Sequence, residues 1–176
     1  MNKIGDAYKC KIFGVDPGSR ITGFACIGSE KKIPLCPRDF KILDIGVIKT
    51  DPKRPHIERI GLLHNALFEL ISLQNPTACV IEKEFAGINP LTSLKLGETR
   101  GSLLAAIHRH SIPIIEITPA QIKRVIGGGG RASKEDVAFA LKNLLQFDRK
   151  ALPYDATDAL AAALCHGLTL AVTQKL

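Results

Sequence analysis

The first 50 residues alternate between short apolar runs and turn residues. Apolar positions recur over 11–16, 21–28 and 40–49, and the third run alternates with polar positions as a half-buried strand does. Pro17-Gly18-Ser19 separates the first two runs and is a turn signal, while 29–39 carries two prolines and predicts an exposed loop. Three consecutive strands with short connections predict an antiparallel meander.

Beyond this meander the apolar period changes to that of a helix. A helix is expected from Ile57 until Asn75-Pro76, and six apolar residues share one of its faces: Ile57, Ile60, Leu63, Leu67, Leu70 and Ile71. The apolar run before Glu82 predicts a strand over 78–82 that is buried on both faces. The remaining elements expected are a long helix over 91–110, a strand over 112–117, a short helix over 119–126, a helix after Ser133 and a last helix from Asp155.

This order of elements predicts an α/β fold. The three-strand antiparallel meander is joined by two parallel strands in a mixed five-stranded sheet, with helices on its faces. A length of 176 residues favours one domain over 1–176, with 1–10 as a loosely ordered extension. The four glycines at 127–130 do not match a phosphate-binding loop and are interpreted as a connector.

Composition excludes several classes of protein. The sequence has no apolar run long enough for a membrane span and no apolar stretch typical of a secretory signal. The five cysteines form no C-x-x-C pair, which favours reduced thiols in a cytoplasmic protein. His108 and His110 are two residues apart and do not share a helix face, so they predict no zinc site.

A net charge of +7 indicates a polyanionic partner, although the charge alone does not identify one. The chain has seven Phe, two Tyr and no Trp. An extended aromatic surface for stacking single-stranded nucleic acid is therefore not expected.

Four acids stand out by their position: Asp16, Glu82, Asp155 and Asp158. Each has an ordinary explanation, since Asp16 could pair with Arg20, Glu82 could face solvent and Asp155 could cap a helix. Asp16, at the end of an apolar strand, needs a cationic partner, a proton or a bound metal ion.

Together, the four acids suggest a metal site. If the first and fourth strands are neighbours, Asp16 and Glu82 converge at one edge of the sheet, and the last helix can bring Asp155 and Asp158 to it. Clustered carboxylates repel one another unless cations hold them, and hard oxygen ligands suit Mg²⁺ or Mn²⁺. Two such ions about 4 Å apart serve in-line phosphoryl transfer.

Four segments carry a resemblance to a known family. They are 13–20 (F-G-V-D-P-G-S-R) with Thr22-Gly23, then Ile81-Glu82 with Phe85, then 94–97 (L-K-L-G) with Arg100-Gly101, and 155–161 (D-A-T-D-A-L-A). In this order they resemble RuvC, the bacterial crossover junction endodeoxyribonucleases with an RNase H-like fold.

The resemblance implies a homodimer that resolves four-way (Holliday) DNA junctions in homologous recombination and DNA repair. It would make paired symmetric nicks with 5′-phosphate and 3′-hydroxyl ends. Asp16, Glu82, Asp155 and Asp158 would be the catalytic, metal-binding acids for two Mg²⁺ ions per subunit, with Mn²⁺ as a substitute. The RuvA–RuvB branch-migration complex would be a partner.

The resemblance also implies residues that contact DNA. Phe85 matches an aromatic side chain that wedges into the bases, with a core Phe as the alternative. Lys123 and Lys134 match basic positions near the active site, with ordinary solvated lysines as the alternative. Lys95 and Arg100, on the polar side of the long helix, complete the DNA-binding set. That helix is also the expected dimer surface.

Three other functions compete with this interpretation. A YqgF-type nuclease acting on RNA shares the Asp-Pro-Gly-Ser strand, but usually lacks the 82–85 segment and the Asp-x-x-Asp helix start. A sugar-kinase or actin-like ATPase needs two such domains, for which 176 residues are too few. A junction-binding protein without cleavage activity would not need all four acids.

Overall fold

The computed structural model describes residues 7–83, 89–147 and 152–173. Within these ranges the chain forms five strands, five α-helices and one short 3-10 helix. In chain order they are β1 (Cys10–Asp16), β2 (Ile21–Ser29), the 3-10 helix η2 (Pro37–Asp39), β3 (Lys41–Lys49), α1 (His56–Gln74), β4 (Ala78–Glu82), α2 (Pro90–His108), β5 (Ile114–Ile117), α3 (Pro119–Val125), α4 (Lys134–Leu145) and α5 (Tyr154–Thr173).

The strands form one mixed sheet in the order β3-β2-β1-β4-β5. The pairs β1–β2 and β2–β3 are antiparallel, whereas β4 lies parallel to both β1 and β5. The predicted meander with two added parallel strands is confirmed. In particular, the first and fourth strands are neighbours, as the convergence of their terminal acids required.

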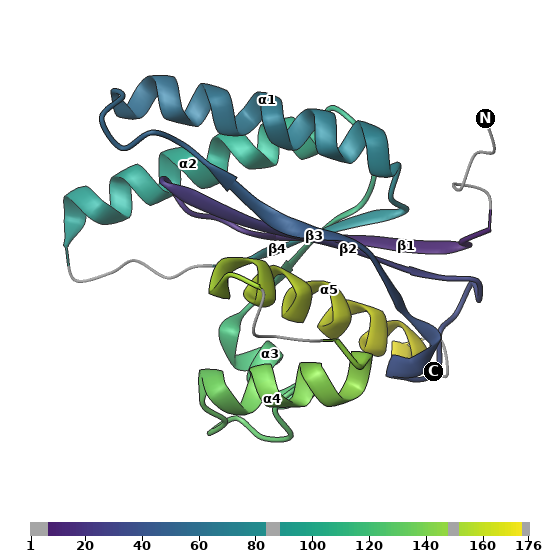
Figure 1. Cartoon of the computed structure of the whole chain (residues 1–176). Helices are drawn as coiled ribbons and strands as arrows, with labels where there is room; N and C mark the ends of the chain where they lie inside the picture. The colour runs from purple at the N-terminus through teal and green to yellow at the C-terminus, as the bar shows by residue number, and fades with distance from the viewer. Residues whose placement is uncertain (1–6, 84–88, 148–151, 174–176) are drawn as a thin grey trace.

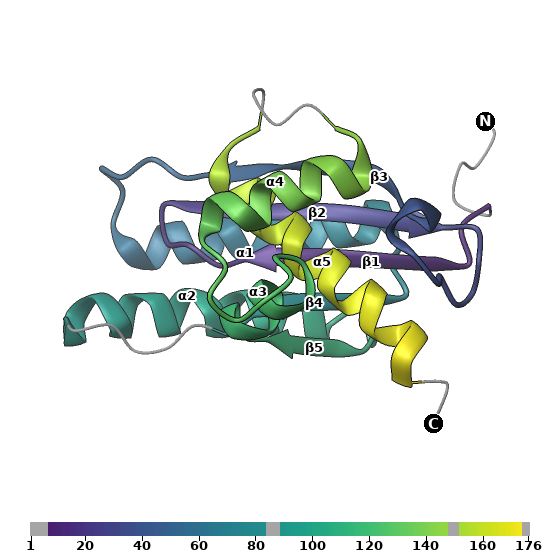
Figure 2. The ribbon, with the colours of Figure 1, turned by 90° about the horizontal axis from the view of Figure 1, so that it is seen from below.

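Helices cover both faces of this sheet. Figure 1 shows α1 and α2 side by side on one face and α5 on the other, with α3 and α4 beyond α5. In the view from below, α5 crosses obliquely in front of the strands, with α4 on its outer side (Figure 2). The molecule is therefore layered, with the sheet between the α1–α2 pair and α5.

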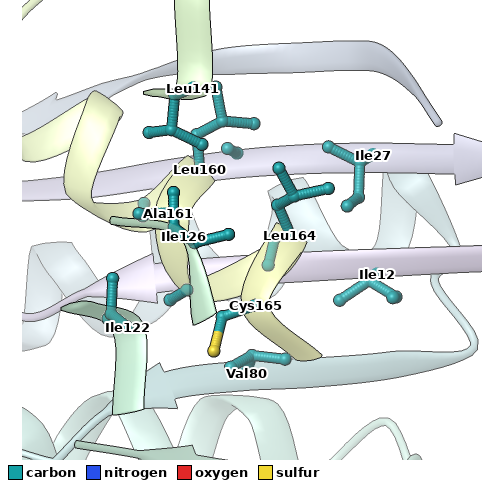
Figure 3. Close-up of a cluster of buried hydrophobic side chains, with 14 of the residues drawn as sticks. Ile12, Ile27, Val80, Ile122, Ile126, Leu141, Leu160, Ala161, Leu164 and Cys165 are labelled. Atoms are coloured by element: carbon teal, nitrogen blue, oxygen red, sulfur yellow. The ribbon is translucent and has the colours of Figure 1, made fainter. Parts of the chain in front are cut away.

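The alternation of side chains along each strand divides the core in two. On β1, Phe13 and Val15 pack with α1 and α2, whereas Ile12 packs with α5. Figure 3 shows the α5 side of the core, where Ile12 and Val80 from the strands meet Leu164 from α5. Gly14 and the side chain of Asp16, two and four residues beyond Ile12, must therefore lie on the α5 side of the sheet as well.

Glycine allows α5 to approach the sheet closely. A Cβ atom at Gly14 of β1 would lie 2.1 Å from the carbonyl oxygen of Ala159 and 3.0 Å from the Cβ of Ala163. A Cβ atom at Gly23 of β2 would lie 2.0 Å from the carbonyl oxygen of Asp155. The α5 backbone thus packs directly against the two strands, which a larger residue at either position would prevent.

Two details differ from the sequence predictions. Ile57 does not belong to the buried face of α1, because its side chain is 72% exposed. The buried residues follow an i, i+4 ridge instead, and Arg59 takes its first position ahead of Leu63 and Leu67. At the N-terminus, β1 already begins at Cys10, since Lys9 donates its backbone N–H to Ser29. Residues 9 and 10 are therefore paired with β2 and are not part of a loose extension.

The five cysteines are free thiols, of which only Cys36 is exposed. Burial raises the pKa of Cys26 and of Cys79 to about 12. Both thiols are protonated at neutral pH and act as small apolar side chains in the core. In the described part of the chain, no helix combines the length and the apolar character that a bilayer crossing needs.

Replacing Gly14 with Ala should destabilise the fold by pushing α5 away from β1. We expect Gly14→Ala to lower the free energy of unfolding by about 1–3 kcal/mol, the usual cost of overpacking a core. Urea unfolding followed by circular dichroism measures it. The control is Gly61→Ala on α1, where an added Cβ meets nothing within 4 Å. This substitution should raise the free energy of unfolding by up to about 1 kcal/mol, because Ala has the higher helix propensity. Equal stability of the two variants would contradict the close-packing argument.

Candidate active site

Asp16 and Glu82 end two adjacent parallel strands on the same face of the sheet. Val15 of β1 pairs with Ile81 of β4, and the two acids are the residues that follow. Since Ile12 and Val80 face α5, the alternation places both acids on that face as well. Both side chains are partly exposed, so they lie at the edge of the sheet.

The first turns of α5 bring two further acids to this edge. Gly23, whose Cβ position lies against the Asp155 carbonyl, is the cross-strand partner of Asp16. This contact places the start of α5 over the strand beside Asp16. Asp158 follows one turn later and lines a pocket together with Glu82. The structure thus brings the four acids that the sequence singled out to one region.

Lys134 supplies positive charge to this group of acids. Its ammonium nitrogen Nζ lies 3.3 Å from Oδ2 of Asp158. The negative charge of Asp158, with smaller contributions from Asp16 and Glu82, raises the pKa of Lys134. Lys134 of α4 therefore interacts electrostatically with three of the four acids, and its direct contact is with Asp158.

Local capping fixes the start of α4 and hence Lys134. Ser133 is the N-cap residue, and its hydroxyl oxygen accepts the backbone N–H of Asp136 at 3.1 Å. In return, the Asp136 carboxylate accepts the backbone N–H of Ser133 at 2.8 Å. These two hydrogen bonds form the predicted capping box. The pKa of Asp136 is lowered because its carboxylate accepts hydrogen bonds from the backbone N–H and the side chain of Ser133.

The pocket beside the acids combines charge with an apolar wall. It is lined by Glu82, Pro119, Ile122, Lys123, Lys134, Val137, Asp158 and Ala161. Pro119 opens α3, whose N-cap Thr118 accepts the N–H of Gln121. This helix brings Lys123 to the pocket, so both of the basic residues expected near the acids line it. The described residues thus present two ammonium groups beside two carboxylates.

The chemistry of the four acids suits a hard divalent cation, since all would offer carboxylate oxygens. Nevertheless, the described residues contain no group of three or more His, Cys, Asp or Glu side chains close enough to form a ready metal cluster. The acids offer the type of ligand that a divalent metal ion prefers, and they lie in the same region of the structure.

Arg100 and Lys95, which are also predicted to contact DNA, are not among the residues that line the pocket. Arg100 of α2 forms an ion pair with Glu116 and donates a long hydrogen bond, 3.4 Å, to the backbone carbonyl of Glu82. Lys95 is exposed on the same helix. Phe85 lies outside the described residues, and its role stays a prediction.

The sequence analysis gave no structural role to three residues that shape this site. Gly14 and Gly23 admit α5, and glycines inside apolar strands are a recognised signal of close backbone approach. Arg59 is buried on α1 and donates a hydrogen bond to the backbone carbonyl of Ser19, in the turn after Asp16. Its signal was a basic residue four positions before Leu63, within an apolar ridge.

The raised pKa of Lys134 gives a testable sign. Substituting Asp158→Asn removes the largest cause, so the pKa of Lys134 should fall towards its ordinary value. The stability gained from the pair is present at neutral pH and is lost as pH rises through the raised pKa. NMR titration of the lysine side chains measures this change, with exposed Lys142 on the same helix as the control. A Lys134 pKa that is the same in both proteins would contradict the assignment.

Comparison with known proteins identifies relatives over nearly the whole chain. A family model described as crossover junction endodeoxyribonuclease RuvC matches residues 12–166. Crossover junction endodeoxyribonuclease RuvC of Chlorobium phaeovibrioides is 35% identical, over 93% of this chain and 84% of the relative. The protein of the same name from Alkalilimnicola ehrlichii is 38% identical, over 89% of this chain and 90% of the relative.

The fold also matches solved structures. The structure of T. thermophilus RuvC in complex with a Holliday junction substrate has a TM-score of 0.84 and 27% identity, covering 93% of this chain and 96% of that one. The yeast mitochondrial Holliday junction resolvase Ydc2, with a TM-score of 0.63 and 15% identity, shares the fold. The structural matches support the predicted RNase H-like fold, and the family matches favour RuvC over the YqgF-type and ATPase alternatives. The chain belongs to the RuvC family of crossover junction endodeoxyribonucleases.

Proposed function

We propose that this protein resolves four-way DNA junctions by paired, symmetric, metal-dependent nicks in recombination and repair. The observation that carries the proposal is the gathering of four acids where β1, β4 and α5 meet, beside a pocket lined by two lysines. Family membership supports the reaction type, and the T. thermophilus relative in complex with a Holliday junction supports the substrate. The products are nicks with 5′-phosphate and 3′-hydroxyl ends, which a ligase can seal.

The metal in this proposal is Mg²⁺, two ions per subunit, with Mn²⁺ as a substitute. Asp16, Glu82, Asp155 and Asp158 would hold the ions, which supply an activated water and stabilise the leaving oxygen. The fold positions the acids rigidly, because two stand on strands and two on a helix packed on those strands. The acids also confine the site to one face of the sheet, so a phosphate must approach from the side of α3 and α4.

The two lysines of the pocket provide positive charge for the phosphate backbone of the DNA. Lys123 and Lys134 stand on different helices and face the same pocket. We assign them to the scissile phosphate, where an ammonium group balances negative charge that the acids would otherwise repel. Lys134 would exchange its contact with Asp158 for one with the phosphate. Lys95, Arg100 and Phe85 are the further proposed DNA contacts.

Paired nicks need two active sites, which a symmetric homodimer supplies. We place the dimer surface on α2, where Leu91 is 71% exposed and Leu94 is 59% exposed. Gly97 and Gly101 follow on that helix, and a Cβ at either would meet nothing within 4 Å. A second copy could therefore approach this surface closely. A partnership with RuvA–RuvB and a cytoplasmic location complete the proposal.

Cleavage of a labelled synthetic four-way junction tests the proposal directly. We expect paired, symmetric nicks on the junction with Mg²⁺, none with EDTA, and none on linear duplex of the same sequence. Sequencing gels locate the nicks, and ligation of the products checks the 5′-phosphate and 3′-hydroxyl ends. Binding without nicking would indicate a structural junction binder, and a preference for RNA would indicate the YqgF-type activity.

The four acids should be needed for cleavage and dispensable for binding. We expect Asp16→Asn, Glu82→Gln, Asp155→Asn and Asp158→Asn each to lower the cleavage rate by about 100-fold or more, because each removes a ligand charge. Junction affinity should persist, since basic residues supply it. Gel-shift titrations in Ca²⁺ measure binding. The control is Glu58→Gln, which changes an exposed carboxylate on α1. Loss of binding in all four variants would refute this division of roles.

A further inference from the structure

Arg59 is a buried cation on the face of the sheet opposite the acids. It stands in the first turn of α1 and is 7% exposed. Taking a guanidinium group out of water is costly unless hydrogen bonds and charge compensate it. Within the described residues, no carboxylate lies within ion-pair distance of this guanidinium. The cost indicates that the guanidinium does something an apolar residue on this ridge could not.

The guanidinium of Arg59 contacts the turn that follows Asp16. Its Nη1 donates a hydrogen bond of 3.0 Å to the backbone carbonyl oxygen of Ser19. The turn is closed on itself, because the Thr22 hydroxyl donates to the Gly18 carbonyl at 2.8 Å. It is also joined to the end of β3, since the Thr50 backbone N–H donates to the Arg20 carbonyl at 3.0 Å. Arg59 adds to this turn a contact that comes from a helix and carries charge.

A second contact links Arg59 to α2. Its Nη2 lies 3.4 Å from Nδ1 of His56, and Nε2 of the same imidazole lies 2.9 Å from Oε2 of Glu98. The Nε2–Oε2 contact is an ion-pair distance without hydrogen-bond geometry, and Nδ1 accepts from Arg59 in the tautomer that carries its proton on Nε2. The negative charge of Glu98, which is half-exposed on α2, thus faces the buried cation through the imidazole. Three successive contacts therefore connect α2 to the turn that follows Asp16: Glu98 to His56, His56 to Arg59, and Arg59 to Ser19.

We propose that Arg59 is a positioning residue for Asp16, and that Glu98 and His56 support it from α2. The inference rests on the proposed function only in taking Asp16 as a catalytic acid. Helix α5 holds the end of β1 from one face of the sheet, and Arg59 holds the adjoining turn from the other. Lysine cannot replace Arg59 fully, since a single ammonium cannot reach the Ser19 carbonyl and the imidazole with a planar fork.

The test compares Arg59→Gln and Arg59→Lys with Arg54→Gln. Arg54 precedes α1, and its side chain forms an exposed ion pair with Glu58, so Arg54→Gln removes a nearby charge from a side chain that does not contact Ser19 in the described structure. For Arg59→Gln we expect hydrogen exchange of residues 16–22 to become at least about tenfold faster. Single-turnover junction cleavage at saturating protein should be about 10–100-fold slower, as small displacements of catalytic groups are. For Arg59→Lys, we expect both the exchange rate of residues 16–22 and the cleavage rate to lie between those of Arg59→Gln and of the wild type.

Junction affinity separates positioning from binding. It should change less than about threefold in the Arg59 variants, because Arg59 is buried and cannot meet DNA. Unchanged exchange over 16–22, or wild-type cleavage, in Arg59→Gln would overturn the proposal. If Arg59→Gln does not fold, Glu98→Gln replaces it, and unchanged exchange of the turn in that variant overturns the link to α2. Should wild type not cut junctions, the proposed function fails, while the exchange data still decide the role of Arg59.

Discussion

Helix α5 touches the sheet with its backbone, and the positions of the candidate acids depend on this contact. Gly14 and Gly23 leave room for the carbonyl oxygens of Ala159 and Asp155 where other residues would place a Cβ. Backbone contact fixes the height of a helix above a sheet more tightly than flexible side chains do, because it has no rotamers to adjust. Acids carried by α5 and acids carried by the strands therefore keep a constant separation without needing to contact one another.

Grouping like charges in this way needs cations from elsewhere in the chain. Lys134 provides one from α4 on the same face as the acids, and its contact with Asp158 is exposed enough to exchange with another partner. Arg59 acts from the opposite face, through the backbone of the turn. The first cation is adjustable and tunes charge, whereas the second is buried and sets shape. The strand end that carries Asp16 thus receives two different kinds of support.

Much of the fold could be predicted from the sequence because each strand is short, apolar and bounded by turn residues. The neighbouring placement of β1 and β4, on which the meeting of Asp16 and Glu82 depends, was only a condition at the level of sequence, and the sheet register supplies it. The role of Arg59 could not be predicted, since a charged residue on an apolar ridge is usually assigned to solvent. Ile57 was assigned to the core because it fits the period, but its side chain lies off the buried ridge. Lys134 could be named from the family resemblance and Asp158 from its position. Their contact could not be predicted, because it depends on how α4 packs on α5.

The alternation of β1 between the two layers has a consequence for how the chain can vary in length. Phe13 and Val15 face α1 and α2, while Ile12, Gly14 and Asp16 belong to the α5 side. Inserting or deleting one residue within this strand would exchange the two sets, placing an aromatic ring against α5 and the acid in the opposite core. Single-residue insertions and deletions should therefore be absent from β1 across relatives, whereas the exposed segment around Leu35 and Cys36 can absorb them.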